Sequence, residues 1–222
     1  MTPTTALLVL AKSPRPGFVK TRLCPPATPE QAARVAAAAL LDTIRALCAV
    51  PGAQPVIVLS GDLDDAVDHR ELRRAVRDLP VIAQRGDTLG ERITAAHDDV
   101  ADLLPGAETL QVGMDTPQIS PDLLRDCRHA LRAPDTDALL GPAADGGWWV
   151  LGLRDPRRAS AIADVPTSRD DTGERTAAAL RGCGLRLVGA PQLTDVDTVD
   201  DARMVAASLP GSRFAAAVRE LV

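Results

Sequence analysis

Aromatic side chains are scarce in this chain. Its 222 residues include no tyrosine, two phenylalanines and two tryptophans, and the tryptophans are adjacent, Trp148 and Trp149. Neighbouring residues on a strand point to opposite faces, so one indole is expected to pack in the core while the other lines a pocket. We take Trp148 as the pocket residue.

Patterns typical of metal-binding or cross-linked cysteines are also missing. The four cysteines are widely spaced, with no Cys-x-x-Cys pair and no histidine at ligand spacing. This spacing argues against a zinc site and against a disulfide framework. Cys48 and Cys127 fall within helical patterns and are expected to be small core residues.

The chain has neither a long apolar run nor an excess of positive charge. No stretch reaches the roughly 18 apolar residues of a membrane span, and the first residues do not resemble a signal peptide. Lysine and arginine number 25 against 30 aspartates and glutamates, a net charge of −5. We therefore expect a cytoplasmic protein with no membrane partner and no nucleic-acid partner.

Predicted strands and helices alternate along the whole chain. Strands are expected at 6–11, 56–59, 81–84, 110–113, 138–141, 150–153 and 185–188. Helices are expected at 29–50, 71–78, 121–132, 157–163 and 172–181, with another ending near 103 and more at the C-terminus. This alternation predicts one α/β domain over 1–222, with a mostly parallel sheet between two helical layers.

A basic loop follows the first predicted strand. The sequence KSPRPGFVKTRL at 12–23 places Lys12, Arg15, Lys20 and Arg22 around Gly17. Ligands of open α/β sheets bind beyond the carboxyl ends of the strands, where cations can neutralise phosphates. The sequence therefore predicts a phosphate site, although a solvated basic loop is the alternative.

Acidic residues follow the later strands. Asp115, Asp145, Asp195 and Asp197 all come just after predicted strand ends. Magnesium bound to a phosphate ligand needs one or two protein carboxylates, and manganese suits the same oxygen ligands. We predict that Asp115 binds Mg²⁺ or Mn²⁺ together with Asp195 or Asp197. The alternative is that Asp195 or Asp197 only caps the helix that follows.

A second candidate ligand loop has the sequence GDTLGER at 86–92. Gly86 and Gly90 would let the backbone approach a flat base, and Asp87 or Glu91 would accept a hydrogen bond from it. The alternative is a plain turn followed by a helix start.

Five sequence blocks together resemble a known bacterial family. They are KSPRPGFVKTRL at 12–23, GDTLGER at 86–92, GMDTP at 113–117, GPAADGGWW at 141–149 and DVDTVDD at 195–201. In this order they resemble the DUF2064 family, also described as selenium- and arsenosugar-associated glycosyltransferases, over residues 7–204. The resemblance implies the glycosyltransferase-A fold of the nucleotide-diphospho-sugar transferase superfamily. The chain is also similar to 2-phospholactate and phosphoenolpyruvate guanylyltransferases.

The resemblance implies a role for each block. Lys12, Lys20 and Arg22 would contact the donor phosphates, and residues 86–91 would lie near the base. Asp115, Asp195 and Asp197 would hold the metal, and residues 145–149 would shape the acceptor pocket. The chain departs from the usual Asp-x-Asp motif, because Thr116 and Pro117 follow Asp115. It also reads VPTS at 165–168, where family members often carry a tryptophan.

Three functions are compatible with these residues. The first is glycosyl transfer from a nucleotide-diphospho-sugar to a small-molecule acceptor. The second is nucleotidyl transfer from a nucleoside triphosphate to a small phosphorylated acceptor, with release of pyrophosphate. The third is a non-catalytic nucleotide-binding accessory subunit. We place glycosyl transfer first, with Asp145, Asp170 or Asp171 as candidate general bases, and leave the oligomeric state open.

Overall fold

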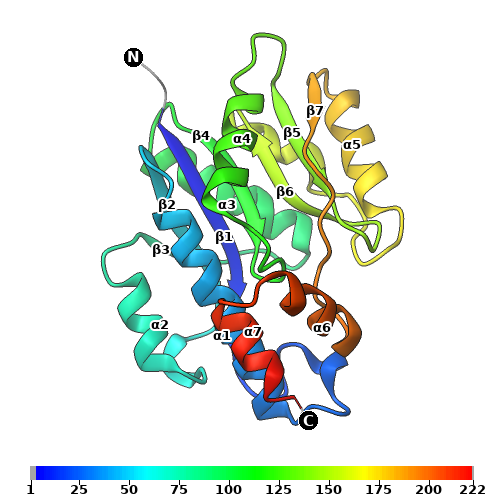
Figure 1. Cartoon of the computed structure of the whole chain (residues 1–222). Coiled ribbons are helices and arrows are strands. Elements are labelled where there is room, and N and C mark those ends of the chain that lie inside the picture. The colour runs from blue at the N-terminus through cyan, green and yellow to red at the C-terminus, as the bar shows by residue number, and fades with distance from the viewer. Residues whose placement is uncertain (1–3, 222) are drawn as a thin grey trace.

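The computed structural model describes residues 4–221 and contains a seven-stranded sheet of order β3-β2-β1-β4-β6-β5-β7 (Figure 1). The strands are β1 (Thr5–Lys12), β2 (Ala53–Ser60), β3 (Val81–Ala83), β4 (Glu108–Gly113), β5 (Ala138–Pro142), β6 (Trp148–Leu153) and β7 (Leu187–Gly189). Strand β6 runs antiparallel to β4 and β5, and the other pairs are parallel. The prediction of a mostly parallel sheet is confirmed.

Helices cover both faces of the sheet. The α-helices are α1 (Pro29–Cys48), α2 (His69–Val76), α3 (Leu89–Leu103), α4 (Pro121–Leu131), α5 (Thr172–Gly182), α6 (Val199–Ser208) and α7 (Arg213–Arg219). Shorter 3-10 helices are η1 (Thr21–Leu23), η2 (Leu63–Asp65) and η3 (Pro156–Ile162). One core contains residues of α1 and α4, and a second contains residues of α3, η3 and α5. The predicted three-layer α/β/α architecture is therefore confirmed.

The C-terminal helices pack beside the basic loop. A third apolar cluster joins Leu23 of η1, Val196, and Phe214 of α7 to the start of α1. The Phe214 backbone N–H also donates to Asp42 Oδ2 at 2.9 Å. Figure 1 shows α6 and α7 below the tip of β1, near the first turns of α1. This packing carries the segment before α6 to the carboxyl edge of the sheet.

Of the two cysteines expected in the core, Cys127 is buried but Cys48 is exposed. The Cys48 prediction is wrong because this residue ends α1, where the helix leaves the sheet. Within residues 4–221, no helix combines the length and the apolar character that crossing a membrane requires.

One histidine lies entirely inside the core between α3 and β4. His97 has no exposed surface, and its Nδ1 atom lies 3.0 Å from Thr109 Oγ1. Burial lowers the pKa of His97 from 6.5 to about 4, so the imidazole is neutral in the folded protein at pH 7.

His97 should make the protein less stable in acid. The unfolded chain takes up a proton near pH 6.5 and the folded chain only near pH 4, so the free energy of unfolding should fall between these values. The full effect is about 3 kcal/mol, at about 1.4 kcal/mol per pKa unit. Urea unfolding of wild type and His97→Phe from pH 7.5 to 4 measures it.

The His97→Phe variant should lose most of this slope, whereas a His129→Gln control should keep it because His129 is exposed. Parallel curves for wild type and His97→Phe would contradict the assignment.

Candidate functional site

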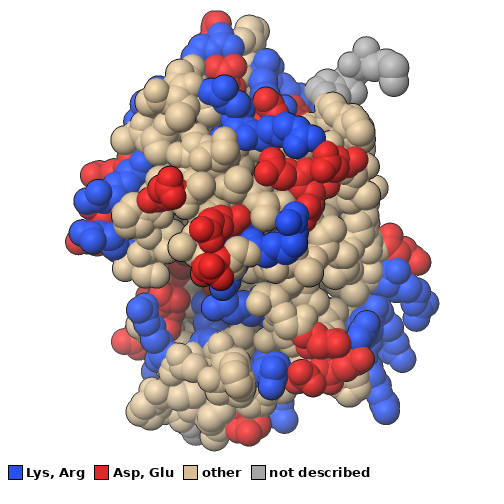
Figure 2. Space-filling view, turned by 180° about the vertical axis from the view of Figure 1, so that it is seen from behind, with Lys and Arg blue, Asp and Glu red and all other residues tan. Residues whose placement is uncertain are grey.

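A cavity of about 600 Å³ lies at the carboxyl ends of β1 and β4. Figure 2 shows the surface hollowed on this side of the molecule, with acidic and basic side chains around the hollow. The predicted site residues that line the cavity are Lys12, Lys20, Arg22, Asp115, Asp145, Trp148, Asp195 and Asp197. These residues come from four of the five sequence blocks, and the fifth, at 86–92, also reaches the cavity through Leu89 and Arg92.

Lys20 is the most enclosed cation of the cavity. Its side chain is only 7% exposed, and its Nζ atom lies 2.6 Å from Asp115 Oδ1 and 3.6 Å from Asp197 Oδ1. The same ammonium donates to the backbone carbonyl of Val196. The backbone of Lys20 is left-handed, with φ of +49°, just before η1. Lys20 therefore connects the basic loop to two acidic segments.

The other cations of the basic loop differ in their partners. Arg22 Nη1 lies 3.0 Å from Asp197 Oδ2. Arg15 lies 3.5 Å from Asp65 and stacks on Phe18, so it does not line the cavity. The Lys12 ammonium is exposed at the cavity and has no acidic partner among residues 4–221. Carboxylates of the protein thus already pair with most of the positive charge that the sequence placed here.

The acidic segments lie side by side because residues 194–197 run along the end of β4. The Val196 N–H donates to the Asp115 carbonyl at 3.0 Å, and the Thr116 hydroxyl donates to Asp195 Oδ1 at 2.8 Å. The following helix α6 is capped by Thr198. The alternative in which Asp195 or Asp197 caps that helix is therefore not what the structure shows.

Asp195 is the carboxyl group most affected by its surroundings. Burial, with a smaller effect from the nearby charges of Asp115 and Asp145, raises its pKa from 3.8 to about 6 against the opposing effects of the Thr116 hydroxyl and of Lys20. A cation at this point would relieve the repulsion. In residues 4–221 no group of three ligating side chains is arranged to hold a metal alone. The donor set instead fits a cation that takes one or two carboxylates and completes its shell with phosphate oxygens.

The hairpin between β5 and β6 presents Asp145 and Trp148. Asp145 Oδ1 accepts the Gly147 N–H at 2.8 Å, which fixes the carboxylate at the turn. Gly146 has φ of +87°, and a Cβ atom there would lie 1.8 Å from the Asp170 carbonyl oxygen. Only glycine allows this close approach. As expected from their alternation, Trp149 is buried and Trp148 is half-buried. The cavity is lined by both indoles, however, and not by Trp148 alone as predicted.

Residues 86–92 form mainly a helix start. Glu91 accepts the backbone N–H groups of Asp87 and Thr88 at 2.7 and 3.1 Å, completing the capping box of α3. A Cβ atom on Gly90 would lie 2.2 Å from the Ala163 carbonyl oxygen, so the close packing of η3 explains this glycine. From this block, Leu89 and Arg92 line the cavity, whereas Gly86, Asp87, Gly90 and Glu91 do not.

Several cavity residues were not predicted from the sequence. They are Phe18, Gln84, Gln111, Thr116, Thr167, Ser168 and Arg169. Gln84 directly follows β3, which ends one residue earlier than the predicted strand at 81–84, and that difference hid it from the strand-end rule that found the aspartates. Of the candidate bases, Asp145 lines the cavity. Asp171 instead pairs with Arg169 and Arg175, which lowers its pKa.

Neutralising Asp195 should stabilise the protein at alkaline pH. Because the folded pKa is above the ordinary value, stability is lost as pH rises from about 4 through 6. Asp195→Asn keeps an oxygen for the Thr116 hydroxyl and removes the charge. Urea unfolding should show a gain of about 1–2 kcal/mol at pH 8, allowing for partial solvent screening, and no difference at pH 4.

The matched control is Asp197→Asn, which removes ion pairs with Lys20 and Arg22 and should give no gain at pH 8. An Asp195→Asn variant no more stable than wild type at pH 8 would show that this carboxylate carries no electrostatic stress.

Comparisons with known proteins identify the family and the fold. Residues 43–169 match the model of a family described as "Uncharacterized protein conserved in bacteria (DUF2064)". A phosphoenolpyruvate guanylyltransferase of Nocardia farcinica is 35% identical over 107 residues, which cover 48% of this chain and 47% of the relative. The match thus spans about half the length of that curated relative.

Two solved structures share the fold. A protein of Desulfovibrio desulfuricans G20, named as a nucleotide-diphospho-sugar transferase, is 25% identical with a TM-score of 0.84 over 99% of both chains. Rv0371c of Mycobacterium tuberculosis H37Rv, crystallised with manganese, is 22% identical with a TM-score of 0.52 over 92% of this chain and 98% of that one. The chain belongs to the DUF2064 family and has the glycosyltransferase-A-like fold of the nucleotide-diphospho-sugar transferases.

Proposed function

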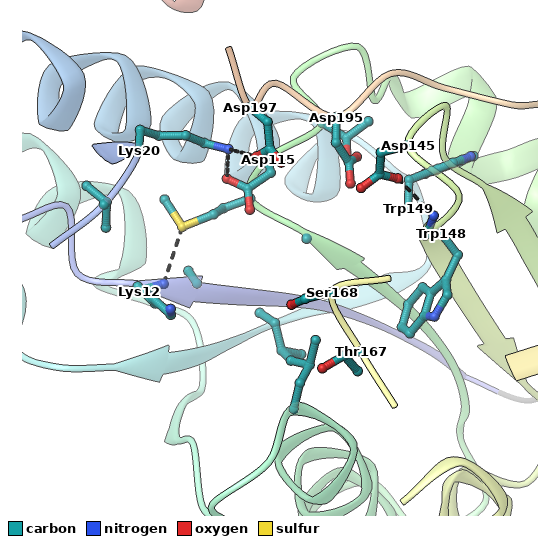
Figure 3. Close-up of a pocket in the computed structure, with 18 of the residues that line it drawn as sticks. Lys12, Lys20, Asp115, Asp145, Trp148, Trp149, Thr167, Ser168, Asp195 and Asp197 are labelled. Carbon is teal, nitrogen blue, oxygen red and sulfur yellow. Dashed lines mark hydrogen bonds and ion pairs between the residues drawn. The ribbon is translucent and has the colours of Figure 1, made fainter. Parts of the chain in front are cut away.

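We propose that the protein is a metal-dependent glycosyltransferase that moves a sugar from a nucleotide-diphospho-sugar to a small-molecule acceptor. One observation carries the proposal. Asp115, Asp145 and Asp195 lie along one side of the cavity, with Lys12 across from them (Figure 3). Carboxylates that repel one another suit a bound metal ion. The unpaired cation opposite them suits the diphosphate to which that metal would be bound.

Asp115 and Asp195 are the residues that would hold Mg²⁺ or Mn²⁺. Lys20 contacts one oxygen of Asp115, which leaves the other for a metal. The pKa of Asp195 is raised by burial first and then by the charges of Asp115 and Asp145, so a cation beside it would stabilise its charged form. The metal would neutralise charge on the leaving diphosphate. We give Asp197 a different role, because it lies against Lys20 and Arg22 and holds both in place.

The charge balance of the basic loop favours a diphosphate over a triphosphate. Arg15 is paired with Asp65, and Lys20 and Arg22 are paired with Asp197. Within residues 4–221, Lys12 is therefore the cation of the basic loop that could bind a phosphate without first breaking an ion pair. A triphosphate would bring more negative charge than this arrangement offsets.

In the proposed reaction an acceptor hydroxyl attacks the anomeric carbon of the sugar. Asp145 accepts the hydroxyl proton, the bond from the anomeric carbon to the phosphate oxygen breaks, and the nucleoside diphosphate leaves with that electron pair. Lys12 stabilises the charge that develops on the leaving oxygens. Trp148, Thr167 and Ser168 line the part of the cavity beside Asp145 where an acceptor would bind.

Nucleotidyl transfer is the second candidate, and the similarity to a guanylyltransferase over half of the chain favours it. In that reaction an acceptor phosphate oxygen attacks the α-phosphorus of a triphosphate, and pyrophosphate leaves. The two reactions release different products, so one assay separates them.

Turnover should depend on Asp115. We expect the purified protein with Mg²⁺ or Mn²⁺ to release a nucleoside diphosphate from one nucleotide-sugar of a panel, including by slow transfer to water. Asp115→Asn should lower that rate at least roughly 100-fold, because it removes transition-state charge stabilisation. Product analysis by chromatography and a pyrophosphate assay measures both reactions.

Asp102→Asn is the control, since Asp102 pairs with Arg157 on the surface of α3, and it should keep full activity. Metal-dependent pyrophosphate release from a triphosphate would replace the first candidate with the second. If no donor yields either product, both catalytic functions are ruled out and the accessory-subunit function remains.

A further inference from the structure

Three polar side chains form a buried row between α3 and β4. His97 and Thr109 have no exposed surface, and Gln111 is 3% exposed. Thr109 and Gln111 are two residues apart on β4, so both face α3. The Gln111 amide lies close enough to the imidazole of His97 to oppose part of the lowering of its pKa.

This row has unused hydrogen-bonding capacity. His97 Nε2 and Gln111 Oε1 are both buried without a hydrogen-bond partner of normal geometry in the described chain. Thr109 Oγ1 lies 3.0 Å from His97 Nδ1 and 3.4 Å from the Leu153 carbonyl oxygen. The shorter contact favours donation of the hydroxyl proton to Nδ1. The imidazole proton is then on Nε2, and Gln111 Oε1 is an unused acceptor on a side chain that already influences the imidazole.

The direction of the amide follows from this proton order. With Oε1 facing the Nε2–H group of His97, the amide nitrogen of Gln111 is left to face the cavity that Gln111 lines. The opposite tautomer would reverse the amide and present its oxygen instead. The proton on His97 therefore selects whether the cavity offers a donor or an acceptor at this point.

Gln111 lies in an uncharged part of the cavity. Leu10 of β1 and Ile93 of α3 line the cavity beside it, whereas the aspartates and Lys12 lie farther along, at the ends of the strands. Space between a sheet and a helix lined by apolar side chains suits a flat, uncharged ring better than a phosphate.

We propose that Gln111 is a specificity-determining residue that donates its amide N–H to an oxygen on an uncharged ring of the nucleotide ligand, and that His97 positions it. The ring oxygen is either a base carbonyl or a sugar hydroxyl. The proposal rests on the proposed function in that it takes the ligand to be a nucleotide.

The test is the affinity of the magnesium complexes of the four nucleoside diphosphates and their nucleotide-sugars for wild type and Gln111→Leu. Losing one neutral hydrogen bond should weaken binding about 3- to 10-fold. Gln54→Leu is the matched control, because within residues 4–221 the Gln54 side chain bonds only the carbonyl oxygen of its neighbour Pro55, and it lies outside the cavity.

A loss with guanine, uracil and cytosine diphosphates but not with the adenine diphosphate assigns the contact to a base carbonyl. A loss with all four diphosphates assigns it to a ribose hydroxyl, and a loss seen only with the nucleotide-sugars assigns it to a hydroxyl of the attached sugar. Equal affinities for Gln111→Leu, Gln54→Leu and wild type overturn the proposal while leaving the proposed function intact. If no nucleotide binds wild type, both fail.

The positioning role of His97 has its own measurement. Proton–nitrogen correlation spectra of the whole protein should show the Nε2–H tautomer at pH 7, and the Nδ1–H tautomer would overturn the orientation. His97→Phe should weaken binding less than Gln111→Leu, because the released amide still reaches the ligand part of the time. The double variant should bind no more weakly than Gln111→Leu alone, since both act on one hydrogen bond.

Discussion

The arrangement of the site depends on the ammonium of Lys20. It is nearly enclosed and contacts three oxygen-bearing groups: Asp115 at the end of β4, Asp197 before α6, and the backbone carbonyl of Val196, the residue preceding Asp197. An enclosed ammonium is stable only where oxygen atoms replace its water, so the three segments must stay together. The third apolar cluster holds the same segments from the outside, through Leu23, Val196 and Phe214. Ion pairs at the cavity and apolar packing behind it thus hold these three segments in one arrangement.

This pairing divides the four aspartates into two groups. Asp197 is neutralised by Lys20 and Arg22 and acts within the protein. Asp195 and Asp145 form no ion pair within residues 4–221, and burial first, then repulsion from Asp115 and Asp145, raises the pKa of Asp195. Asp115 belongs to both groups, because Lys20 occupies one of its oxygens. The site therefore lacks positive charge only on the side of Asp195 and Asp145. A metal ion bound to a phosphate ligand would supply positive charge there.

The sequence predicted the strand ends because buried strands and the polar residues after them have a local signal. It placed Asp115, Asp145, Asp195 and Lys12 at one edge of the sheet, and the structure has them there. It could not show that Lys20 pairs with Asp197, since these residues are 177 positions apart and the contact depends on the path of the chain. It also could not separate a ligand loop from a capping box at 86–92, because both use glycine and acidic residues. Gln111 gave no signal, since a single polar residue in a strand is usually on its solvent side.

The single antiparallel strand keeps two parts of the cavity at one edge of the sheet. Asp145 follows the carboxyl end of β5, and because β6 reverses direction after a short hairpin, Trp148 at its start stays at that edge, beside the carboxyl end of β4. The chain then returns through β7, parallel to β5, and residues 193–197 pass that same edge, where Ala143 pairs with Leu193. With β6 parallel, a crossover connection of a dozen or more residues would follow Asp145, and Trp148 would begin at the opposite edge. The reversal therefore keeps Trp148 close to the acidic side of the cavity, and side chains of α3 and β4 line the rest of it.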